Sequence, residues 1–178
     1  MPSFTFDSVH SSEYGVYFSS VDRTLLPSKR INQYVIPGRD GIYEVENGYE
    51  PRDITCVLGF TGDDFSREEL RVKARAVAQW LSGSGLLVFD DEPDKGYKAS
   101  VVNGVSIEEV AATGKASVAF HCQPFAERLV YSLAATGQVA LPKTAQVVVE
   151  GTQATDAMIY IKAAGTIKNV TVKRLTTY

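Results

Sequence analysis

The side chains that most often carry out chemistry are scarce in this chain of 178 residues. It has two histidines, His10 and His121, and two cysteines, Cys56 and Cys122, and neither pair is close in the sequence. The sequence contains neither the Gly-x-Ser-x-Gly elbow of many hydrolases nor the Gly-x4-Gly-Lys-Ser/Thr loop that binds phosphates. The cysteines also lack the close spacing of a zinc site. We therefore expect no catalytic residues, no metal site and no cofactor.

An acidic run, Asp90-Asp91-Glu92-Pro93-Asp94, is the densest cluster of carboxylates. Calcium binds such oxygens, but the run lacks the spaced ligands and the central glycine of a calcium loop. Pro93 and the nearby Gly96 instead favour a turn between two strands. We expect a surface turn here.

The segment Ile36-Pro37-Gly38-Arg39-Asp40-Gly41 has the composition of a tight loop. Pro37-Gly38 suits a type II turn, and Asp40-Gly41 tolerates the positive φ of a reversal. Arg39 is then held outward, where its guanidinium can form a bidentate pair with a carboxylate. A plain surface turn is the simpler interpretation, and an interface loop is the functional one.

Arg67, Arg71 and Arg75 recur every four residues and would share one face of a helix. Such a stripe could contact phosphates, but neighbouring glutamates can pair with it locally. The net charge of −3 also argues against a nucleic-acid partner. We expect a solvated or subunit-facing surface and no nucleic-acid recognition.

Composition is that of an ordinary globular protein, with 44% hydrophobic and 22% charged residues. No apolar run approaches the roughly 18 residues that cross a bilayer, and no secretory signal is visible. We expect a protein that is made in the cytoplasm and does not insert into membranes.

The elements that would position these residues are mostly strands. Alternating apolar residues in Arg52–Phe60 and Lys115–Gln123 predict half-buried strands, with Cys56 and Cys122 on the buried faces. Short turns between the strands favour a sandwich or barrel-like core. Further strands are expected at Gly15–Ser19, Ile31–Ile36, Leu86–Phe89, Tyr97–Val102, Ser106–Ala111 and Leu129–Leu133.

One segment has the period of a helix. Ser66 and Glu69 match a capping box, and apolar residues follow at three- and four-residue spacing as far as Leu81. Ser82-Gly83-Ser84-Gly85 then ends the pattern. We expect a single helix packed on a sheet.

A boundary is expected near residue 133. Residues 134–178 contain only two of the 18 aromatic residues and carry a net charge of +3, against −6 for residues 1–133. About 45 residues are too few for a stable separate core. The expected organisation is a domain at 1–133 and a short β segment at 134–178, with strands at Ala145–Glu150, Met158–Lys162 and Ile167–Arg174.

Several of these segments occur together in an order that resembles the distal tail protein family (Dit, or Sipho_tail) of long-tailed phages of Gram-positive hosts and their prophages. The resemblance covers residues 1–132. The residues that carry it are the Ile36–Gly41 loop, Tyr49-Glu50-Pro51-Arg52 with the strand after it, the helix ending at Trp80-Leu81, the run from Leu86 to Ala99, and Phe120-His121-Cys122-Gln123-Pro124-Phe125.

The resemblance implies a mainly β fold, in which an N-terminal β-sandwich with one α-helix and a projecting β-hairpin precedes a short β-rich C-terminal segment. That segment would be a partial galectin-like domain, because the family usually continues into a full one. The implied role is structural, in the tail tip or baseplate of the virion. Six copies would form a hub ring that joins the tail tube protein to the tail tip protein and to receptor-binding proteins. Assembly would take place in the host cytoplasm.

A ring of identical copies needs two complementary patches on each subunit. Our candidates for these inter-subunit contacts are the loop, with Arg39 facing a neighbour's carboxylate, and the acidic turn. The residues are Ile36, Pro37, Gly38, Arg39, Asp40, Gly41, Asp90, Asp91, Glu92 and Asp94.

Two alternatives remain open. A β-sandwich module that binds host carbohydrate would present aromatic platforms, for which Trp80 is a poor candidate because it falls near the core. An enzyme that degrades the cell wall would need a catalytic constellation, which the sequence does not show.

Overall fold

The computed structural model describes residues 2–62, 65–129 and 151, and the chain divides into two units, Met1–Ser132 and Leu133–Tyr178. All the elements described below belong to the first unit. The expected domain boundary near residue 133 stays a prediction. The strand expected at 129–133, apart from Leu129, and the three strands expected further on lie outside the described residues.

Eight antiparallel strands form the main sheet. They are β1 (Phe4–Phe6), β2 (Val9–His10), β3 (Val16–Asp22), β6 (Arg52–Phe60), β7 (Ser84–Phe89), β8 (Lys95–Val101), β9 (Lys115–Cys122) and β10 (Glu127–Arg128). Their order is β2-β1-β7-β8-β9-β6-β3, with β10 beside β8. This confirms the expected mainly β fold.

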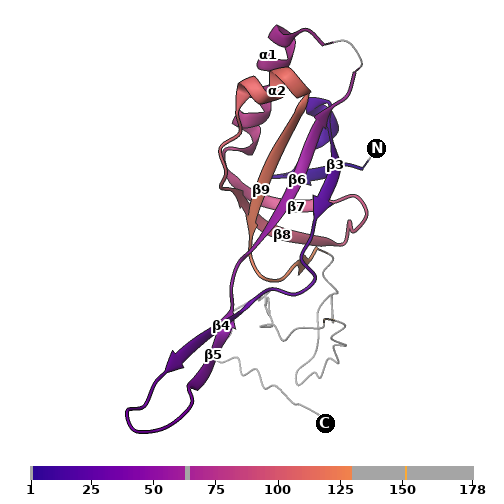
Figure 1. Cartoon of the computed structure of the whole chain (residues 1–178). Helices are drawn as coiled ribbons and strands as arrows, with labels where there is room; N and C mark the ends of the chain where they lie inside the picture. The colour runs from indigo at the N-terminus through magenta and orange to yellow at the C-terminus, as the bar shows by residue number, and fades with distance from the viewer. Residues whose placement is uncertain (1, 63–64, 130–150, 152–178) are drawn as a thin grey trace, which may run out of the picture. The chain divides into compact units, whose positions relative to one another are not determined.

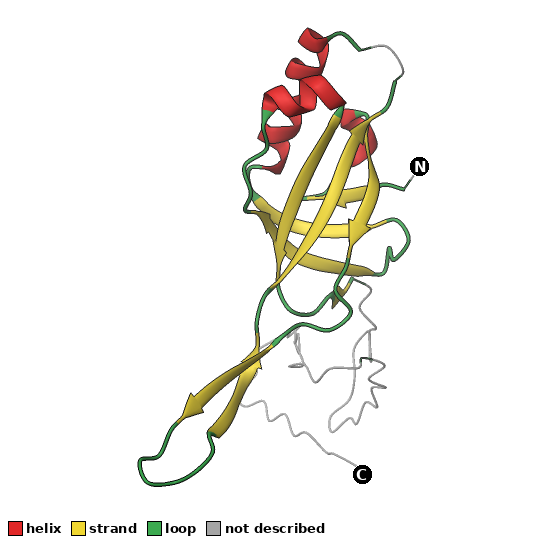
Figure 2. Ribbon diagram, viewed as in Figure 1, coloured by secondary structure: helices red, strands yellow, loops and turns green. Residues whose placement is uncertain are grey.

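The sheet curls until its last strand, β3, approaches the segment just before β1 near the other end. The long strands β6 and β9 run across β7 and β8 (Figures 1 and 2). The backbone N–H of Phe18 in β3 donates to the carbonyl oxygen of Pro2, just before β1, over 3.2 Å. Because crossed strands enclose one core between them, we call this body, with its helices, the barrel.

Every second side chain along the strands points into the barrel and fills its core, as the two-residue period of the sequence predicts. In β6 the side chains of Ile54, Cys56, Leu58 and Phe60 are buried, and Cys122 at the end of β9 joins the same core. Burial raises the pKa of Cys56 to about 12 and that of Cys122 to about 11. Both cysteines therefore act as small apolar residues in this structure.

The main helix, α1 (Arg67–Leu81), begins where the sequence predicts. The Ser66 hydroxyl accepts the backbone N–H of Glu69 over 3.3 Å, and the Glu69 carboxylate accepts that of Ser66 over 2.9 Å. This reciprocal pair is the expected capping box.

The single tryptophan, Trp80, points from α1 into the barrel. Its ring stacks on Phe4 at 5.5 Å and on Tyr14 at 4.8 Å between centroids. Its indole N–H donates to the carbonyl oxygen of Phe6 over 3.1 Å. Trp80 is therefore partly buried, with its ring stacked on other side chains, and it makes a poor exposed platform for a sugar ring.

The strand expected at Ser106–Ala111 is wrong, because this segment forms a second helix, α2 (Ile107–Thr113), packed against α1. The Ser106 hydroxyl caps its first turn by accepting the backbone N–H of Glu109, and Gly114 ends it in the left-handed conformation. Val110 and Ala111, which are adjacent in sequence, are both buried. Ser106 and Glu109 have the Ser-x-x-Glu spacing of a helix start, and this signal is stronger than the short alternation of apolar residues that suggested a strand.

A separate two-stranded sheet is formed by β4 (Lys29–Tyr34) and β5 (Tyr43–Tyr49), which we call the hairpin together with the loop between them. It projects from the end of the barrel where β3 ends and β6 begins (Figure 1). One extra residue in β5 shifts the register near Gly48, whose φ of +77° suits a bulge glycine. A short 3-10 turn, Ser11–Tyr14, completes the described elements.

Candidate interaction surface

The hairpin exposes more apolar surface than any other segment that the structure describes. Twelve large hydrophobic side chains are exposed in the described residues; seven of them lie in the hairpin, and Leu25 and Leu26 lie just before it. Every residue of β4 and all but the last of β5 are exposed. Concentrated apolar exposure on a soluble protein marks a surface that a partner covers.

The two faces of the hairpin differ in character. Residues opposite each other in an antiparallel ladder share a face, and successive residues alternate between faces. One face holds apolar and aromatic residues and the other mostly polar ones. The cross-strand pairs are Tyr34 with Tyr43 and Asn32 with Val45 on the first face, and Gln33 with Glu44 and Ile31 with Glu46 on the second.

Side-chain contacts fix the polar face and the base of the hairpin. The Lys29 ammonium lies 2.8 Å from the Glu46 carboxylate, and the Gln33 amide donates to Glu44 over 2.8 Å. At the base, Arg30 Nε donates to Glu50 over 2.8 Å, which lowers the pKa of Glu50. These contacts are exposed and each contributes little stability, but together they leave the polar face with few unpaired charges.

The loop at the end of the hairpin, residues 35–42, is the tip. The backbone N–H of Arg39 donates to the carbonyl oxygen of Ile36 over 3.2 Å, and Gly38 has a φ of +81°. These features agree with the type II turn expected at Pro37-Gly38. Gly41, with a φ of +92°, makes the reversal that its sequence predicts.

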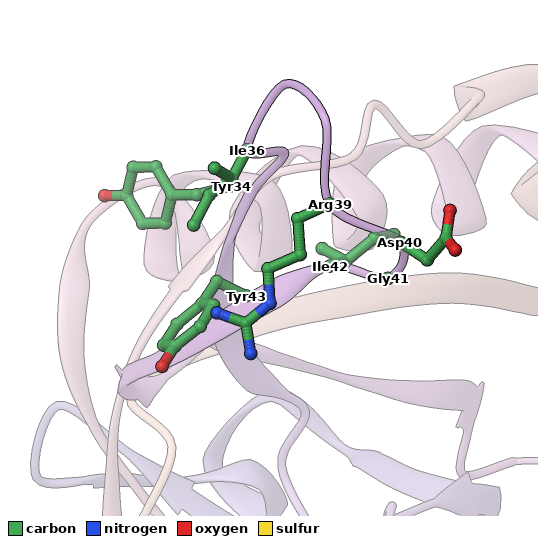
Figure 3. Close-up of a pocket in the computed structure, with 7 residues that line it drawn as sticks. All are labelled: Tyr34, Ile36, Arg39, Asp40, Gly41, Ile42 and Tyr43. Atoms are coloured by element: carbon green, nitrogen blue, oxygen red, sulfur yellow. The ribbon is translucent and has the colours of Figure 1, made fainter.

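A shallow hollow of about 120 Å³ lies on the tip (Figure 3). The Arg39 guanidinium folds back over the Tyr43 ring, 5.5 Å from its centroid, and the Asp40 carboxylate points away from it. Among the described residues neither Arg39 nor Asp40 has an ion-pair partner. The tip therefore carries two unpaired charges among exposed apolar side chains such as Ile36 and Ile42.

The acidic run forms the expected turn between β7 and β8, but its carboxylates are engaged within the chain. Arg23 binds both Asp91 and Glu92, and its guanidinium also lies 4.7 Å above the Phe89 ring. The Arg23 contact lowers the pKa of Asp91. Asp90 faces His10, with His10 Nε2 3.2 Å from its carboxylate.

A second arginine holds the start of the segment that leads to the hairpin. Arg52 donates from Nη1 to the carbonyl oxygen of Thr24 over 2.7 Å, and its guanidinium lies 4.7 Å above the Tyr97 ring. Arg23 and Arg52 thus tie the base of the hairpin to β7 and β8. Sequence reasoning missed both residues, because their partners are distant in the chain.

The structure does not bring the two predicted patches together within one subunit. The loop 36–41 lies at the end of the hairpin, whereas the acidic turn lies on the barrel (Figure 1). Of the acidic residues, Asp94 makes no side-chain ion pair in the described part of the chain. The exposed tyrosines Tyr34 and Tyr43 were also missed, since an alternating strand pattern gives no sign of which face lacks a cover.

The described residues show neither a metal site nor a membrane-spanning helix. No group of three or more His, Cys, Asp and Glu side chains there could hold a metal ion. No helix in the same residues is long and apolar enough to cross a membrane. His121, the second histidine, is exposed and lies 2.7 Å from the Asp53 carboxylate.

Comparison with known proteins gives a family. The sequence model of a family named Sipho_tail and described as "Phage tail protein RIFT-related domain" matches residues 10–122. No curated protein matches the chain.

Among solved structures, the chain is similar to the Dit protein (gp 19.1) of phage SPP1, described as a paradigm of hub adsorption apparatus in phages that infect Gram-positive bacteria. The TM-score is 0.56 at 18% sequence identity, over 69% of this chain and 50% of that one. The likeness concerns the fold, and the chain spans about half the length of that protein.

Proposed function

Because the chain belongs to the Sipho_tail family of phage tail proteins, we propose that it is a hub subunit of the tail, of which six copies close into a ring. In this proposal the ring sits at the tail tip or baseplate. It joins the tail tube protein to the tail tip protein and offers attachment to receptor-binding proteins. The subunits are made and assembled in the host cytoplasm, and the role is structural, not enzymatic.

The observation that carries this proposal is the exposed hairpin. A two-stranded ribbon is marginally stable in water, and this one places Tyr34, Tyr43 and Val45 on a face that nothing in the described residues covers. A surface of this kind fits a subunit that is completed by a neighbour. The similarity of the fold to a hub protein supports the same assignment.

The loop 36–41 remains our candidate for one of the ring contacts. Arg39 has no carboxylate partner among the described residues and stands at the exposed tip. The acidic turn is the weaker candidate, because Asp90, Asp91 and Glu92 already have partners within the subunit. If an Arg39→Ala protein assembles normally, Arg39 does not contribute to the contact between subunits.

The mass of the purified protein in solution tests whether six copies form a ring. Six chains of 19.4 kDa would weigh about 116 kDa by light scattering and appear in negative stain as rings with a central channel. A monomer at all concentrations would contradict self-assembly of the purified chain. In that case the carbohydrate-binding alternative is tested next, by the binding of the same sample to a glycan array.

A further inference from the structure

Both outer edges of the hairpin are open. β4 and β5 form a sheet of two strands, and no other described strand pairs with either of them. In such a ladder every second residue of each strand turns its backbone N–H and carbonyl away from the partner strand. Every residue of β4 is exposed, and so is every residue of β5 before Tyr49. The hairpin therefore presents two rows of backbone groups, the β4 edge and the β5 edge, to which a further strand can pair.

The two edges carry charges of opposite sign. Residues 28–38, which contain β4, hold two cations, Lys29 and Arg30, and no carboxylate. Residues 43–50, which contain β5, hold three carboxylates, Glu44, Glu46 and Glu50, and no cation. Charged side chains on an edge strand ordinarily prevent another strand from pairing there. Because these edges differ in sign, two β4 edges or two β5 edges repel each other, whereas a β4 edge attracts a β5 edge.

Contacts within the hairpin leave its carboxylates able to bind another cation. Lys29 lies 2.8 Å from the Glu46 carboxylate, and Arg30 Nε lies 2.8 Å from that of Glu50. Glu44, in the part of the chain that the structure describes, accepts the neutral amide of Gln33 over 2.8 Å. An ionised carboxylate has about four acceptor positions, so one contact does not saturate it. Glu44 and Glu46 are both exposed and remain accessible to the side chains of a neighbouring strand.

A second copy of this chain offers the complementary edge. The hairpin projects from the barrel, so its edges are accessible to another subunit (Figure 2). When two hairpins point in the same direction, β5 of one copy runs opposite to β4 of the next, so the two strands pair antiparallel, as they do within each hairpin. This contact joins two different edges and is therefore head-to-tail. Repeated with a fixed rotation, a head-to-tail contact closes into a ring.

The register of the hairpin itself also suits the joint between copies. Tyr34 lies opposite Tyr43 and Gln33 opposite Glu44 within one hairpin. In the same register, Tyr43 of one copy lies opposite the partner's Tyr34, and the apolar face continues from one hairpin to the next. Cross-strand pairs of aromatic side chains stabilise a sheet. A shift by one residue would instead place apolar side chains on the polar face, so the pattern of the two faces favours this register.

We propose that the hairpins of neighbouring copies of this chain join edge to edge, with the β5 edge of one copy paired to the β4 edge of the next. This inference rests on the proposed ring and specifies one of its contacts. Backbone hydrogen bonds and the aromatic pairs hold the joint together. The opposite charges of the edges select the head-to-tail arrangement over a two-fold dimer, in which like charges would meet.

A full-length variant with reversed edge charges tests the contact and keeps the hairpin's own ion pairs. Lys29→Glu with Glu46→Lys exchanges the partners of the first pair. Arg30→Glu with Glu50→Arg exchanges those of the second, so both pairs can still form. We expect the reversed chain to associate with itself as the unchanged chain does, because its two edges still differ in sign. Every joint between a reversed and an unchanged chain, however, brings like charges together.

Co-expression of two chains, one with an affinity tag, measures this selection. The tagged unchanged chain should capture at least about tenfold less of the reversed chain than of an untagged unchanged chain. The matched control exchanges an exposed pair of the barrel, Lys98→Glu with Glu127→Lys, whose charged groups lie 2.7 Å apart in the unchanged chain. This control should be captured as well as the unchanged chain. Equal capture of the reversed chain would overturn the edge-to-edge contact.

Single cysteines in separate chains test the register and detect weak association. A Gln33→Cys chain and a Glu44→Cys chain each lack the opposite cysteine in their own hairpin, so a disulfide can form only between copies. Mild oxidation of the mixture should give linked dimers, whereas each chain alone should stay unlinked. The native cysteines are buried with raised pKa values and should not react. The control mixes the Glu44→Cys chain with an Ala112→Cys chain, which carries its thiol on an exposed residue of α2, and should also stay unlinked.

The outcomes separate this contact from the ring itself. If the unchanged chain forms rings and captures the reversed chain equally well, the edge-to-edge contact is wrong and the hub proposal stands. If the unchanged chain is always monomeric and the two cysteine chains give no linked dimer, both fail. Selective capture without a disulfide would support the contact and overturn its register. Linked dimers from chains that are monomeric by light scattering would support the contact as a weak one.

Discussion

The barrel and the hairpin place the same kinds of side chain in opposite surroundings. In the barrel, Phe4, Phe6 and Phe120 are 0% exposed, and alternation along each strand hides one face from water. In the hairpin, Tyr34 and Tyr43 also alternate with polar residues, yet they are 55% and 54% exposed. The barrel folds around its own apolar face, whereas the apolar face of the hairpin is left for another molecule. Alternation therefore indicates a face that will be covered, without saying by which chain.

The largest difference in the free energy of unfolding is expected when an aromatic side chain is removed from the barrel and, separately, from the hairpin. Phe120→Ala should lower the free energy of unfolding by about 3–5 kcal/mol, because it leaves a cavity in a packed core. Tyr43→Ala should change it by less than about 0.5 kcal/mol while weakening self-association. Denaturant unfolding followed by the fluorescence of Trp80, the only tryptophan, measures the first quantity. Equal losses would show that the hairpin unfolds as part of the barrel.

A smaller effect is expected from the ion pairs. Arg23→Ala should lower the free energy of unfolding by about 1 kcal/mol at neutral pH, since it removes two carboxylate contacts and the stacking on Phe89. Lys29→Ala, which breaks an exposed pair in the hairpin, should have no measurable effect.

The Arg23 contact also predicts a pH dependence. The pKa of Asp91 is lower in the folded chain than its ordinary value of 3.8, so its contribution is complete above about pH 4 and is lost as the pH falls through the lowered pKa. The stability difference between the unchanged chain and Arg23→Ala should therefore shrink in acid. A difference that stays constant down to pH 2 would contradict this assignment.

Helix capping gives the next effect in size. Ser66→Ala should cost the barrel about 1 kcal/mol, because it removes the hydroxyl half of the capping box of α1. The matched change at the base of the hairpin, Ser28→Ala, should be neutral, since within the described part of the chain Ser28 is held only through its backbone carbonyl, which accepts the N–H of Glu50. Thermal unfolding of the two variants side by side measures the contrast.

The smallest effect concerns the turns. In the barrel, the turn between β1 and β2 holds Asp7 and Ser8 at φ values of 49° and 67°, a region that favours glycine. The hairpin uses glycines at its own positive-φ positions, Gly38 and Gly41. Ser8→Gly should therefore stabilise the barrel by about 0.5 kcal/mol, and Gly38→Ala should leave barrel stability unchanged. A loss of stability in Ser8→Gly would mean that the Ser8 side chain contributes more than the strain costs.

Local signals in the sequence predicted much of this molecule. The bounds of β6 and the start of α1 follow from two-residue alternation and from Ser66 with Glu69, because these signals depend on near neighbours in the chain. The turn at Pro37-Gly38 was predicted for the same reason. The strand predicted at Ser106–Ala111 was wrong because its short alternating pattern suggested a strand, whereas Ser106 caps the first turn of α2. The contact with α1 also favours the helix.

The sequence by itself determined a mainly β domain with a capped helix, an exposed loop at 36–41 and an acidic turn at 90–94. Only the tertiary structure decided what these parts meet. It used the acidic turn to hold Arg23, packed Trp80 against the core, and left the apolar side chains of the hairpin exposed. The physical reason is that turns and caps depend on adjacent residues, whereas burial and ion pairing depend on residues that only the folded sheet brings together.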